Sequence, residues 1–349
     1  MSDHGSLNPL ATCVVLCRNE ALFIERCIMS LVANRQQYPN LEILVVDGLS
    51  DDGTREIVQR LAGVVPEVRM VDNPRRTTPA AFNTGILAAR GSIILPIGAH
   101  STYPPHYCAT LITALQESQA NNVGGHCRTI PANDGWQARG IALALGHPLG
   151  VGNALFRLKP TTARWVDTVP FGCYRRELFD RLGLFDEELL RNQDDEFNHR
   201  LRSAGGRILL VPDVEVDYVA RGTYGQLRRM FWQYGVYKPL AAAKVGSLPT
   251  IRQLVPPAFV AALVALTVLA LLPTGTEWPL LTLVVVYCLA VGSQAVRLVS
   301  REGLGAAAGF VLAVPVMHVM YGAGWLVGAL RLLRRGGVNR PNTDLGLSR

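Results

Sequence analysis

Three consecutive acidic residues, Asp194, Asp195 and Glu196, stand within the stretch LLRNQDDEFNHRLRSAGG. A carboxylate fixed beside a substrate hydroxyl can take its proton and so act as a general base. The structural alternative is that acids in the first turn of a helix complement its dipole, an effect worth about 0.3 to 1 kcal/mol per charge. The stretch by itself leaves both interpretations open.

The same stretch has the pattern of a helix that positions these acids. Asn192 precedes them and is a residue type that caps helix N-termini. Phe197 and Leu201 follow at a spacing of four, which predicts a buried helix face. We therefore expect Asp194 and Asp195 in the first turn of this helix.

A second group of polar residues follows two apolar, β-branched runs. CRNEA comes after ATCVVLC, and DGLSDDGT comes after LEILVVDG, which places Asp47 at a strand end and Ser50, Asp51 and Asp52 in a turn. The structural alternative for this turn is an Asx turn followed by a helix cap. The functional alternative is that the Asp47 carboxylate accepts the imide N–H of a uracil while backbone amides approach ribose or phosphates.

Strand-like and helix-like patterns alternate through the first hundred residues. This alternation predicts βαβ units and an α/β fold with a Rossmann-like, mostly parallel sheet, whose ligands bind at the carboxyl ends of the strands. The expected strands are 11–17, 41–48, 68–73 and 92–98, and the expected helices are 20–33, 53–63 and 79–91.

Several functional classes are disfavoured by missing motifs. No GxGxxG follows the first strand, and GVGNAL has Leu155 where the third glycine would stand, so a dinucleotide fold is disfavoured. No GxxxxGK[ST] motif occurs, which argues against an NTPase. The net charge of +7 comes without an aromatic-interleaved basic module, so no nucleic-acid partner is expected. The seven scattered cysteines lack a CxxC pair and favour reduced thiols and no structural zinc.

The C-terminal third predicts membrane-spanning helices. The segments 254–272, 278–296 and 303–330 are long and apolar enough to cross a hydrocarbon core of roughly 30 Å. A third full crossing would put the basic end RLLRRGGVNR outside, against the positive-inside tendency. The alternative is a re-entrant or interfacial hairpin broken at Pro315 and at the glycines Gly322, Gly324 and Gly328. The N-terminus lacks a signal-peptide pattern, and we expect the first domain in the cytoplasm.

These observations predict four regions along the chain. They are a catalytic domain over 1–225, an interfacial amphipathic helix region over 226–250, transmembrane helices over 251–335, and a polar tail over 336–349. A multi-pass protein of the inner (cytoplasmic) cell membrane is expected.

Several motifs in order carry a family resemblance. They are CRNEALFIERCIMSL, ILVVDGLSDDGTREIV, DNPRRTTPAAFNTGILAARG, HPLGVGNALFR, VDTVPFGCYRRELFDRLGLFDEELLRNQDDEFNHRLRSAGGRI and RRMFWQYGVYK. Together they resemble the membrane-bound branch of the inverting family-two glycosyltransferases over nearly all of the first 240 residues. The resemblance implies a glycosyltransferase A fold, a uridine diphosphate sugar as donor, and a polyprenyl-linked glycan as acceptor.

The resemblance implies roles for residues of the first two loops. Arg18, Asn19 and Glu20 fall in the donor-side loop, and Asp47 becomes the candidate for the uracil contact. Many relatives carry two acids in succession after that strand, whereas the second position here is Gly48. The base contact therefore rests on Asp47.

Further donor-side residues follow from the same resemblance. Arg75 would approach the nucleotide or its phosphates, with surface solvation as the alternative. Asp167 lies in a segment that resembles the one closing over the sugar. Arg229 would meet the diphosphate, and Trp232 would either close the donor site or anchor the helix at the membrane interface.

The sequence departs from the family at the expected metal site. Family members carry Asp-x-Asp or Asp-x-His after the fourth strand to hold a divalent ion on the diphosphate, whereas LPIGAH has Gly98 in the first position and His100 in the last. A single imidazole is a poor magnesium site, and manganese tolerates imidazole better. The resemblance implies Mn²⁺ or Mg²⁺, and the alternatives are neutralisation by Arg or Lys or loss of activity.

In the resembling family a Glu-Asp pair supplies the catalytic base. Its Glu falls on Gln193 and its Asp on Asp194, so the resemblance implies that Asp194 is the base. Asp195 is placed with the donor-binding residues and is the alternative base, while Glu196 assists acceptor or helix geometry. The implied activity is inverting transfer from a nucleotide sugar to a lipid-linked or polysaccharide acceptor. The alternatives are transfer to a polyprenyl phosphate and a non-catalytic nucleotide-sugar or glycan-binding scaffold.

Overall fold

The computed structural model describes residues 8–246, 250–273 and 275–334, which fall into two compact units. Of these residues, the first unit holds 8–128 and 159–218, and the second holds 129–158, 219–246, 250–273 and 275–334. The predicted catalytic domain ran without a break to residue 225, whereas the structure groups 129–158 with the C-terminal helices. The predicted tail, 336–349, lies outside the described residues.

The first unit contains one nine-stranded sheet and the helices that pack on it. Strand β6 extends by two residues into the second unit, and strand β9 extends by one. The elements of the first unit are β1 (Ala11–Cys17), α1 (Ile24–Ala33), η1 (Asn34–Gln36), β2 (Leu41–Asp47), α2 (Thr54–Ala62), β3 (Val68–Asp72), α3 (Thr78–Ala88), β4 (Ile93–Gly98), β5 (Ser101–Thr102), α4 (Tyr107–Glu117), β6 (Asn122–Ile130), β7 (Arg164–Val166), β8 (Cys173–Arg175), α7 (Glu177–Leu182), α8 (Gln193–Ser203) and β9 (Ile208–Val219).

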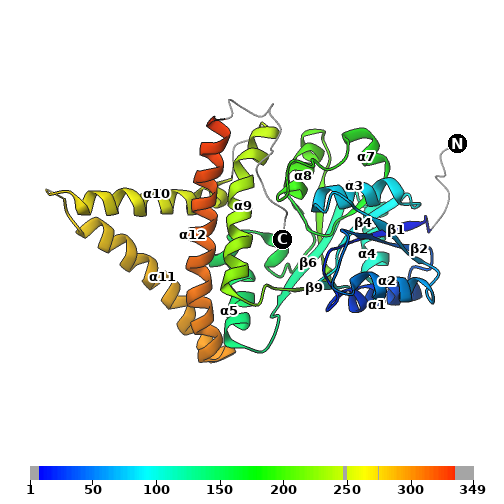
Figure 1. The fold of residues 1–349 in the computed structure, drawn as a ribbon, viewed down its shortest axis with the longest axis horizontal. Coiled ribbons are helices and arrows are strands. Elements are labelled where there is room, and N and C mark those ends of the chain that lie inside the picture. Colours follow the sequence, from blue (N-terminus) through cyan, green and yellow to red (C-terminus); the bar gives the residue numbers. More distant parts are fainter. Residues whose placement is uncertain (1–7, 247–249, 274, 335–349) are drawn as a thin grey trace. The chain divides into compact units, whose positions relative to one another are not determined.

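One half of the sheet is parallel, in the order β3-β2-β1-β4. Helices α1 and α2 lie on one face of these strands and α3 lies on the other (Figure 1). Gly85 lets α3 approach closely, because a Cβ there would stand 2.2 Å from Val14 Cγ1. These are the elements that the alternating pattern predicted.

The other half of the sheet is largely antiparallel. Strand β8 pairs antiparallel with β4 and with β6, and β9 pairs antiparallel with β5 and with β7. The sheet as a whole is therefore mixed, and the expectation of a mostly parallel sheet holds only for β1 to β4. The strands β5 to β9 were not among the four strands expected from the sequence.

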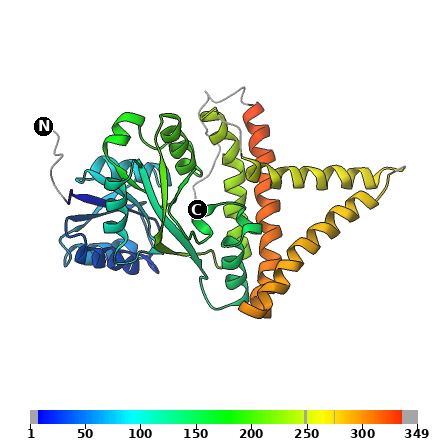
Figure 2. The ribbon, with the colours of Figure 1, turned by 180° about the vertical axis from the view of Figure 1, so that it is seen from behind.

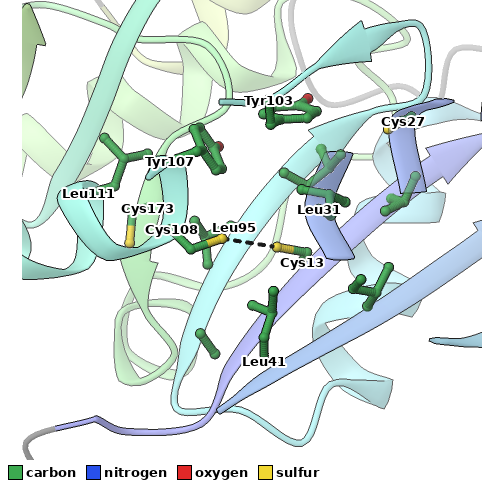
Figure 3. Close-up of a cluster of buried hydrophobic side chains, with 14 of the residues drawn as sticks. Cys13, Cys27, Leu31, Leu41, Leu95, Tyr103, Tyr107, Cys108, Leu111 and Cys173 are labelled. Carbon is green, nitrogen blue, oxygen red and sulfur yellow. Dashed lines mark hydrogen bonds between the residues drawn. The ribbon is translucent and has the colours of Figure 1, made fainter. Parts of the chain in front are cut away.

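The core below the parallel strands contains several cysteine thiols. Cys13 Sγ of β1 and Cys108 Sγ of α4 lie 3.7 Å apart among buried aliphatic and aromatic side chains (Figure 3). Burial raises the pKa of the Cys13 thiol well above its ordinary value, and it raises that of Cys27 to about 12. These thiols act as small apolar core residues.

A buried carboxylate joins the amino ends of the strands, opposite the edge where ligands are expected. Glu42 accepts hydrogen bonds from Thr12 Oγ1 at 2.6 Å, from the Arg90 amide at 2.9 Å and from Arg69 Nε at 2.6 Å. Burial alone would raise the pKa of Glu42, but these hydrogen bonds outweigh it and hold the pKa below its usual value. Glu42 therefore serves the stability of the fold.

The second unit is helical. Its elements are α5 (Trp136–Leu145), α6 (Pro148–Val151), η2 (Leu155–Arg157), α9 (Tyr224–Lys244), α10 (Ile251–Leu271), α11 (Trp278–Glu302) and α12 (Leu304–Arg334). Helices α9 and α12 run side by side, while α10 and α11 lean away from them (Figure 2).

Helix α12 is continuous from Leu304 to Arg334, through Pro315. The re-entrant hairpin considered for this segment is therefore wrong, since 31 residues form one helix of about 46 Å. The glycines that suggested a break are instead positions where α12 packs closely against a neighbouring helix. A Cβ at Gly324 would lie 2.5 Å from the Trp232 carbonyl oxygen of α9, and one at Gly328 would lie 2.3 Å from that of Val236.

Three helices in the described part of the chain are long and apolar enough to cross a membrane. They are α10, α11 and α12, with 21, 25 and 31 residues and mean hydropathies of 2.4, 1.9 and 1.7. Their bounds agree with the three predicted segments within a few residues at most ends. Close packing through glycine is typical of helices in a membrane, where small residues allow backbones to touch.

Candidate functional site

The loops that follow the four parallel strands gather at one edge of the sheet. Cys17 of β1 pairs with Asp47 of β2, Asp47 pairs with Asp72 of β3, and Leu16 of β1 pairs with Gly98 of β4. The segments after these residues carry most of the donor-side residues that the sequence predicted. The structure thus brings the predicted loops together at the carboxyl edge of the parallel strands.

Hydrogen bonds join the loop after β1 to the loop after β2. The Asn19 amide donates to Ser50 Oγ at 2.9 Å, and the Asp51 amide donates back to Asn19 Oδ1 at 3.1 Å. The Glu20 amide donates to Thr54 Oγ1 at 2.8 Å. Asn19 itself has a left-handed backbone with φ of 55°. The predicted donor-side loop therefore has a defined shape that its neighbour maintains.

Asp47 forms the turn that follows β2. Its carboxylate accepts the Ser50 amide at 3.0 Å and the Ser50 hydroxyl at 2.5 Å, and it pairs with Arg55 Nη1 at 2.6 Å. Its side chain is 0% exposed. This is the Asx turn of the structural alternative, and a carboxylate with no exposed surface is poorly suited to bind a uracil in this conformation.

Asp72, at the end of β3, is an exposed acid that the sequence analysis did not select. Arg55 Nη1 donates to its carboxylate at 2.8 Å as well as to Asp47, and hydrogen bonds to Asp72 and Asp47 raise the pKa of the Arg55 guanidinium. The Asp72 side chain is 51% exposed. Its position near the end of the predicted strand 68–73 was the available signal.

Gly48 makes room for the Arg18 side chain. A Cβ at position 48 would lie 3.0 Å from Arg18 Cβ and 3.1 Å from Arg18 Cδ. The guanidinium stem of Arg18 therefore packs over the peptide at the position where many relatives carry a second acid.

A phenylalanine ring occupies the space beside Gly98. A Cβ at position 98 would lie 2.9 Å from Phe171 Cε1. Phe171 belongs to the segment that resembles the sugar-closing loop, and its carbonyl accepts the Tyr107 hydroxyl at 2.8 Å. The Gly98 amide is likewise bound, donating to Tyr103 Oη at 2.9 Å. An aspartate at position 98 would therefore collide with Phe171 in this arrangement.

His100 lies beside the Glu20 carboxylate. Its Nδ1 is 3.3 Å from Glu20 Oε1, and its ring meets Tyr218 edge-on with 5.1 Å between ring centroids. The Glu20 side chain is 5% exposed and that of His100 is 19% exposed. Among the described residues no group of three or more His, Cys, Asp or Glu is arranged to hold a metal ion. The protein thus offers two ligands here.

Asp194 and Asp195 lie in the first turn of α8, as predicted, and both are half-buried. The Asp195 amide donates to Asp194 Oδ1 at 3.0 Å. Burial, with a smaller effect of the Asp194 charge, raises the pKa of Tyr174. The predicted cap is not formed, because Asn192 has a left-handed backbone with φ of 64° and its side chain does not cap the helix.

Aromatic packing and a buried ion pair hold helix α8 in place. Phe197 is fully buried, with its ring centroid 5.0 Å from that of Phe179 and 4.9 Å from that of Phe185. Glu196 receives two hydrogen bonds from Arg200, at 2.6 and 2.9 Å, and Arg200 also donates to the Leu182 carbonyl at 2.6 Å. Glu196 therefore maintains helix geometry, one of its two predicted roles.

Asn198 links α8 to the loop that carries Asp167. Its Nδ2 donates to Thr168 Oγ1 at 2.9 Å, and its Oδ1 accepts Asn122 Nδ2 at 2.9 Å. Asn198 is fully buried. Because Asp167 is adjacent to Thr168, this bond brings the Asp167 loop beside the helix that presents Asp194.

Arg75 pairs with Glu187 in the loop that precedes α8. Asn83 of α3 also donates to Glu187, at 2.9 Å, and its Oδ1 accepts the Phe185 amide at 2.9 Å. The loop after β3 is thereby joined to the loop before α8. A contact between Arg75 and phosphate remains a prediction.

Arg229 and Trp232 lie on α9, in the second unit. Arg229 is exposed and Trp232 is half-buried. The contact of Arg229 with the diphosphate and the role of Trp232 at the donor site or at the membrane interface remain predictions.

The fold and this edge of the sheet define a class, the glycosyltransferases with a glycosyltransferase A fold. A mannosyltransferase from Pyrobaculum calidifontis, solved with GDP-mannose and Mn²⁺, superposes with a TM-score of 0.57 at 22% identity, covering 90% of this chain and 88% of that one. GalNAc-T7, solved with UDP, GalNAc and Mn²⁺, superposes with a TM-score of 0.50 at 17% identity, over 70% of this chain and 52% of that one.

Sequence comparison places the chain within this class. Glycosyl transferase family 2 matches residues 12–183. The succinoglycan biosynthesis protein ExoA of Rhizobium meliloti is 32% identical over 345 residues, or 96% of this chain and 99% of that protein. A dolichyl N-acetyl-α-D-glucosaminyl phosphate 3-β-D-2,3-diacetamido-2,3-dideoxy-β-D-glucuronosyltransferase of Methanococcus voltae is 27% identical over 65% of this chain and 72% of its own length. The chain belongs to glycosyl transferase family 2.

Proposed function

We propose that this glycosyltransferase is an inverting enzyme that moves a sugar from a uridine diphosphate sugar to a lipid-linked glycan or polysaccharide acceptor. Relatives that act in succinoglycan biosynthesis and on a dolichyl-linked sugar support such an acceptor. The observation that carries the proposal is the placement of Asp194, half-buried at the start of a rigid helix whose underside is fixed by Phe197 and Asn198.

The reaction would be a single in-line displacement. The acceptor hydroxyl oxygen attacks the anomeric carbon, Asp194 accepts the hydroxyl proton, and the bond to the nucleoside diphosphate breaks, so that an α-linked donor gives a β-linkage. The rigid support of α8 keeps the carboxylate in position without a cost at the moment of reaction. Asp195 and Asp167 would bind sugar or acceptor hydroxyls from the same side.

The donor would lie along the edge of the parallel strands. The loop after β1, with Arg18, Asn19 and Glu20, would face the nucleotide. The side chains of Arg75, Arg229 and Trp232 would approach the diphosphate. Asp47 would act by maintaining the loop, with a base contact only after its pair with Arg55 opens. A divalent cation bound with the donor would neutralise charge on the leaving diphosphate, and the carboxylate and imidazole of Glu20 and His100 suit Mn²⁺ better than Mg²⁺.

The membrane region would bring the enzyme to its acceptor. Helices α10, α11 and α12 would cross the inner membrane, with the catalytic unit on the cytoplasmic face where nucleotide sugars are made. The basic residues Arg331 and Arg334 at the end of α12 are then the exception to the positive-inside tendency. A cysteine-accessibility scan of both helix ends in intact cells would test this orientation.

The base assignment is tested by Asp194→Asn, with Asp195→Asn as the matched neighbour. In full-length protein in detergent, transfer from UDP-sugars to lipid-linked acceptors should fall by about 10² or more in Asp194→Asn, with an unchanged melting temperature. Full activity in Asp194→Asn would refute the assignment, and loss only in Asp195→Asn would move the base by one residue. Turnover of a bare polyprenyl phosphate by Asp194→Asn would favour that acceptor, whose oxygen needs no base. Absence of turnover with every nucleotide sugar would favour a binding scaffold.

A further inference from the structure

We propose that Glu20 supplies the carboxylate that position 98 lacks, so that Glu20 and His100 together bind the divalent cation of the donor diphosphate. This inference rests on the proposed nucleotide-sugar-dependent activity. It assigns the missing ligand to a different strand of the sheet, since Glu20 follows β1 and His100 follows β4.

The two strands are neighbours in the sheet, which brings their ends together. β1 and β4 pair in parallel register as far as Leu16 and Gly98 (Figure 1). Glu20 and His100 therefore leave the sheet from adjacent positions. Their facing atoms, Oε1 and Nδ1, are 3.3 Å apart.

This separation suits two ligands of one ion. Two ligand atoms that each lie about 2.1 Å from an octahedral ion, at right angles, are separated by roughly 3.0 Å. The observed 3.3 Å is within a few tenths of an ångström of that value. A small rotation of either side chain would admit the ion in place of the direct hydrogen bond.

The backbone of both ligands is already fixed. The Glu20 amide donates to Thr54 Oγ1, and its carbonyl accepts the Ile24 amide at 2.9 Å at the start of α1. The His100 ring is placed by its edge-on contact with Tyr218. A carboxylate that is 5% exposed needs a compensating partner, which the imidazole or a cation can provide.

Position 98 cannot supply the ligand while Phe171 keeps its place. The ring stands 2.9 Å from where a Cβ would be, so any side chain there must displace it. A carboxylate that faces His100 is supplied instead by Glu20, which follows the neighbouring strand β1.

Because the protein supplies only a pair of ligands, binding of the ion should depend on the nucleotide. Octahedral coordination needs about six ligands, and two from the protein leave most positions to diphosphate oxygens and water. We therefore expect weak binding of Mn²⁺ alone and strong binding of Mn²⁺ together with a nucleoside diphosphate. Imidazole as one ligand favours Mn²⁺ over Mg²⁺.

The test measures nucleotide binding, independently of turnover. Affinities of the full-length protein in detergent for UDP and for GDP are determined by calorimetry in Mn²⁺ and in EDTA, and bound Mn²⁺ is followed by electron paramagnetic resonance. The wild type should bind one of these nucleotides at least about tenfold more tightly in Mn²⁺. Glu20→Gln and His100→Ala should lose most of that gain, so that the ratio of their affinities in Mn²⁺ and in EDTA falls towards one.

Matched control variants separate ligation from general damage. Glu25→Gln changes an exposed glutamate on α1 that pairs with Arg60, and His106→Ala changes a histidine that contacts the Asp213 carbonyl. Both should retain the Mn²⁺ gain. In the Glu20→Gln background, adding Gly98→Asp with Phe171→Ala should restore part of it, because the carboxylate then returns to β4.

Two results would overturn the inference while the proposed function stands. One is equal nucleotide affinity of the wild type in Mn²⁺ and EDTA, and the other is a full Mn²⁺ gain in a folded Glu20→Gln variant. If the wild type binds neither UDP nor GDP under any condition, the proposed nucleotide-sugar activity fails and this inference fails with it. Melting temperatures within a few degrees of the wild type show that the variants are folded.

Discussion

Replacing Asn198 by alanine should loosen the catalytic helix without touching Asp194. The side chain is fully buried and makes two hydrogen bonds of 2.9 Å, one to Thr168 and one from Asn122, and it accepts a longer one of 3.4 Å from the Tyr174 hydroxyl. In Asn198→Ala all three partners lose a bond inside the protein. Because Asp167 adjoins Thr168, the loop and the helix would no longer be joined at this point.

The size of the effect follows from burial. A buried polar group that loses its partner costs about 1 to 3 kcal/mol. The Asn122 amide keeps a second bond, to Tyr174 Oη at 2.9 Å, so the cost falls mainly on Thr168 and on the small cavity. We expect a total loss of about 2 to 4 kcal/mol in stability, or a fall of roughly 5 to 15 °C in melting temperature.

The assay compares melting temperature and kinetics in one detergent. Asn198→Ala should melt at the lower temperature and should also show a reduced kcat below its melting point, because Asp194 is less well positioned. Asn40→Ala is the control, since Asn40 is exposed and makes one bond, to the Asn8 carbonyl. It should stay within about 0.5 kcal/mol of the wild type.

The kinetic result decides whether the network positions the base. A large drop in melting temperature with unchanged kcat would refute the argument that Asn198 holds the catalytic geometry. A melting temperature equal to that of the wild type would refute the energetic argument itself. Asn198→Asp provides a further check, because it keeps the shape but replaces the donor to Thr168 by an acceptor.

Two further predictions concern stability in each unit. Glu42→Gln should lower the melting temperature at pH 7, because hydrogen bonds depress the folded-state pKa of Glu42. The stabilisation by the Glu42 carboxylate is complete above about pH 5 and disappears as the pH falls through the folded pKa. The difference in melting temperature from the wild type should therefore shrink towards pH 3, and a constant difference would contradict the prediction. Gly328→Ala should separate α9 from α12 and lower the free energy of unfolding by about 1 to 3 kcal/mol. The control Gly292→Ala lies on α11, where a Cβ meets nothing within 4 Å, and it should be neutral or slightly stabilising. Equal thermal stability of the two detergent-solubilised variants would contradict the packing argument.

The parallel half of the sheet and the catalytic helix could be predicted because their signals are local. Apolar runs typical of strands alternate with segments that have helical spacing. Each apolar run is followed by polar residues, which in the structure lie at the carboxyl edge of the parallel strands. Phe197 and Leu201 showed the buried face of α8, and both are fully buried. The acids could therefore be placed in the first turn before their surroundings were known.

The remaining features depend on contacts between distant residues, which spacing does not record. The sequence left Asp47 either as a uracil contact or as part of an Asx turn, and only the structure shows that Arg55 and Ser50 occupy its carboxylate. Glu20 and His100 are 80 positions apart, and their proximity follows from strand order. The glycines of α12 suggested a broken helix, although their purpose is contact with other helices.

The close contact between α5 and α12 also constrains how the chain is made. A Cβ at Gly140 would lie 2.3 Å from the Gly309 Cα, so the two backbones touch. The ribosome completes α5 and must add roughly 170 more residues before this part of α12 exists, a delay on the order of 10 to 30 s at usual rates of synthesis. During that time α5 lacks α12, although α6 and α9, which it also contacts, are made earlier. A fragment that ends before α10 would keep this surface uncovered permanently, so truncation after the catalytic residues should give an aggregating product.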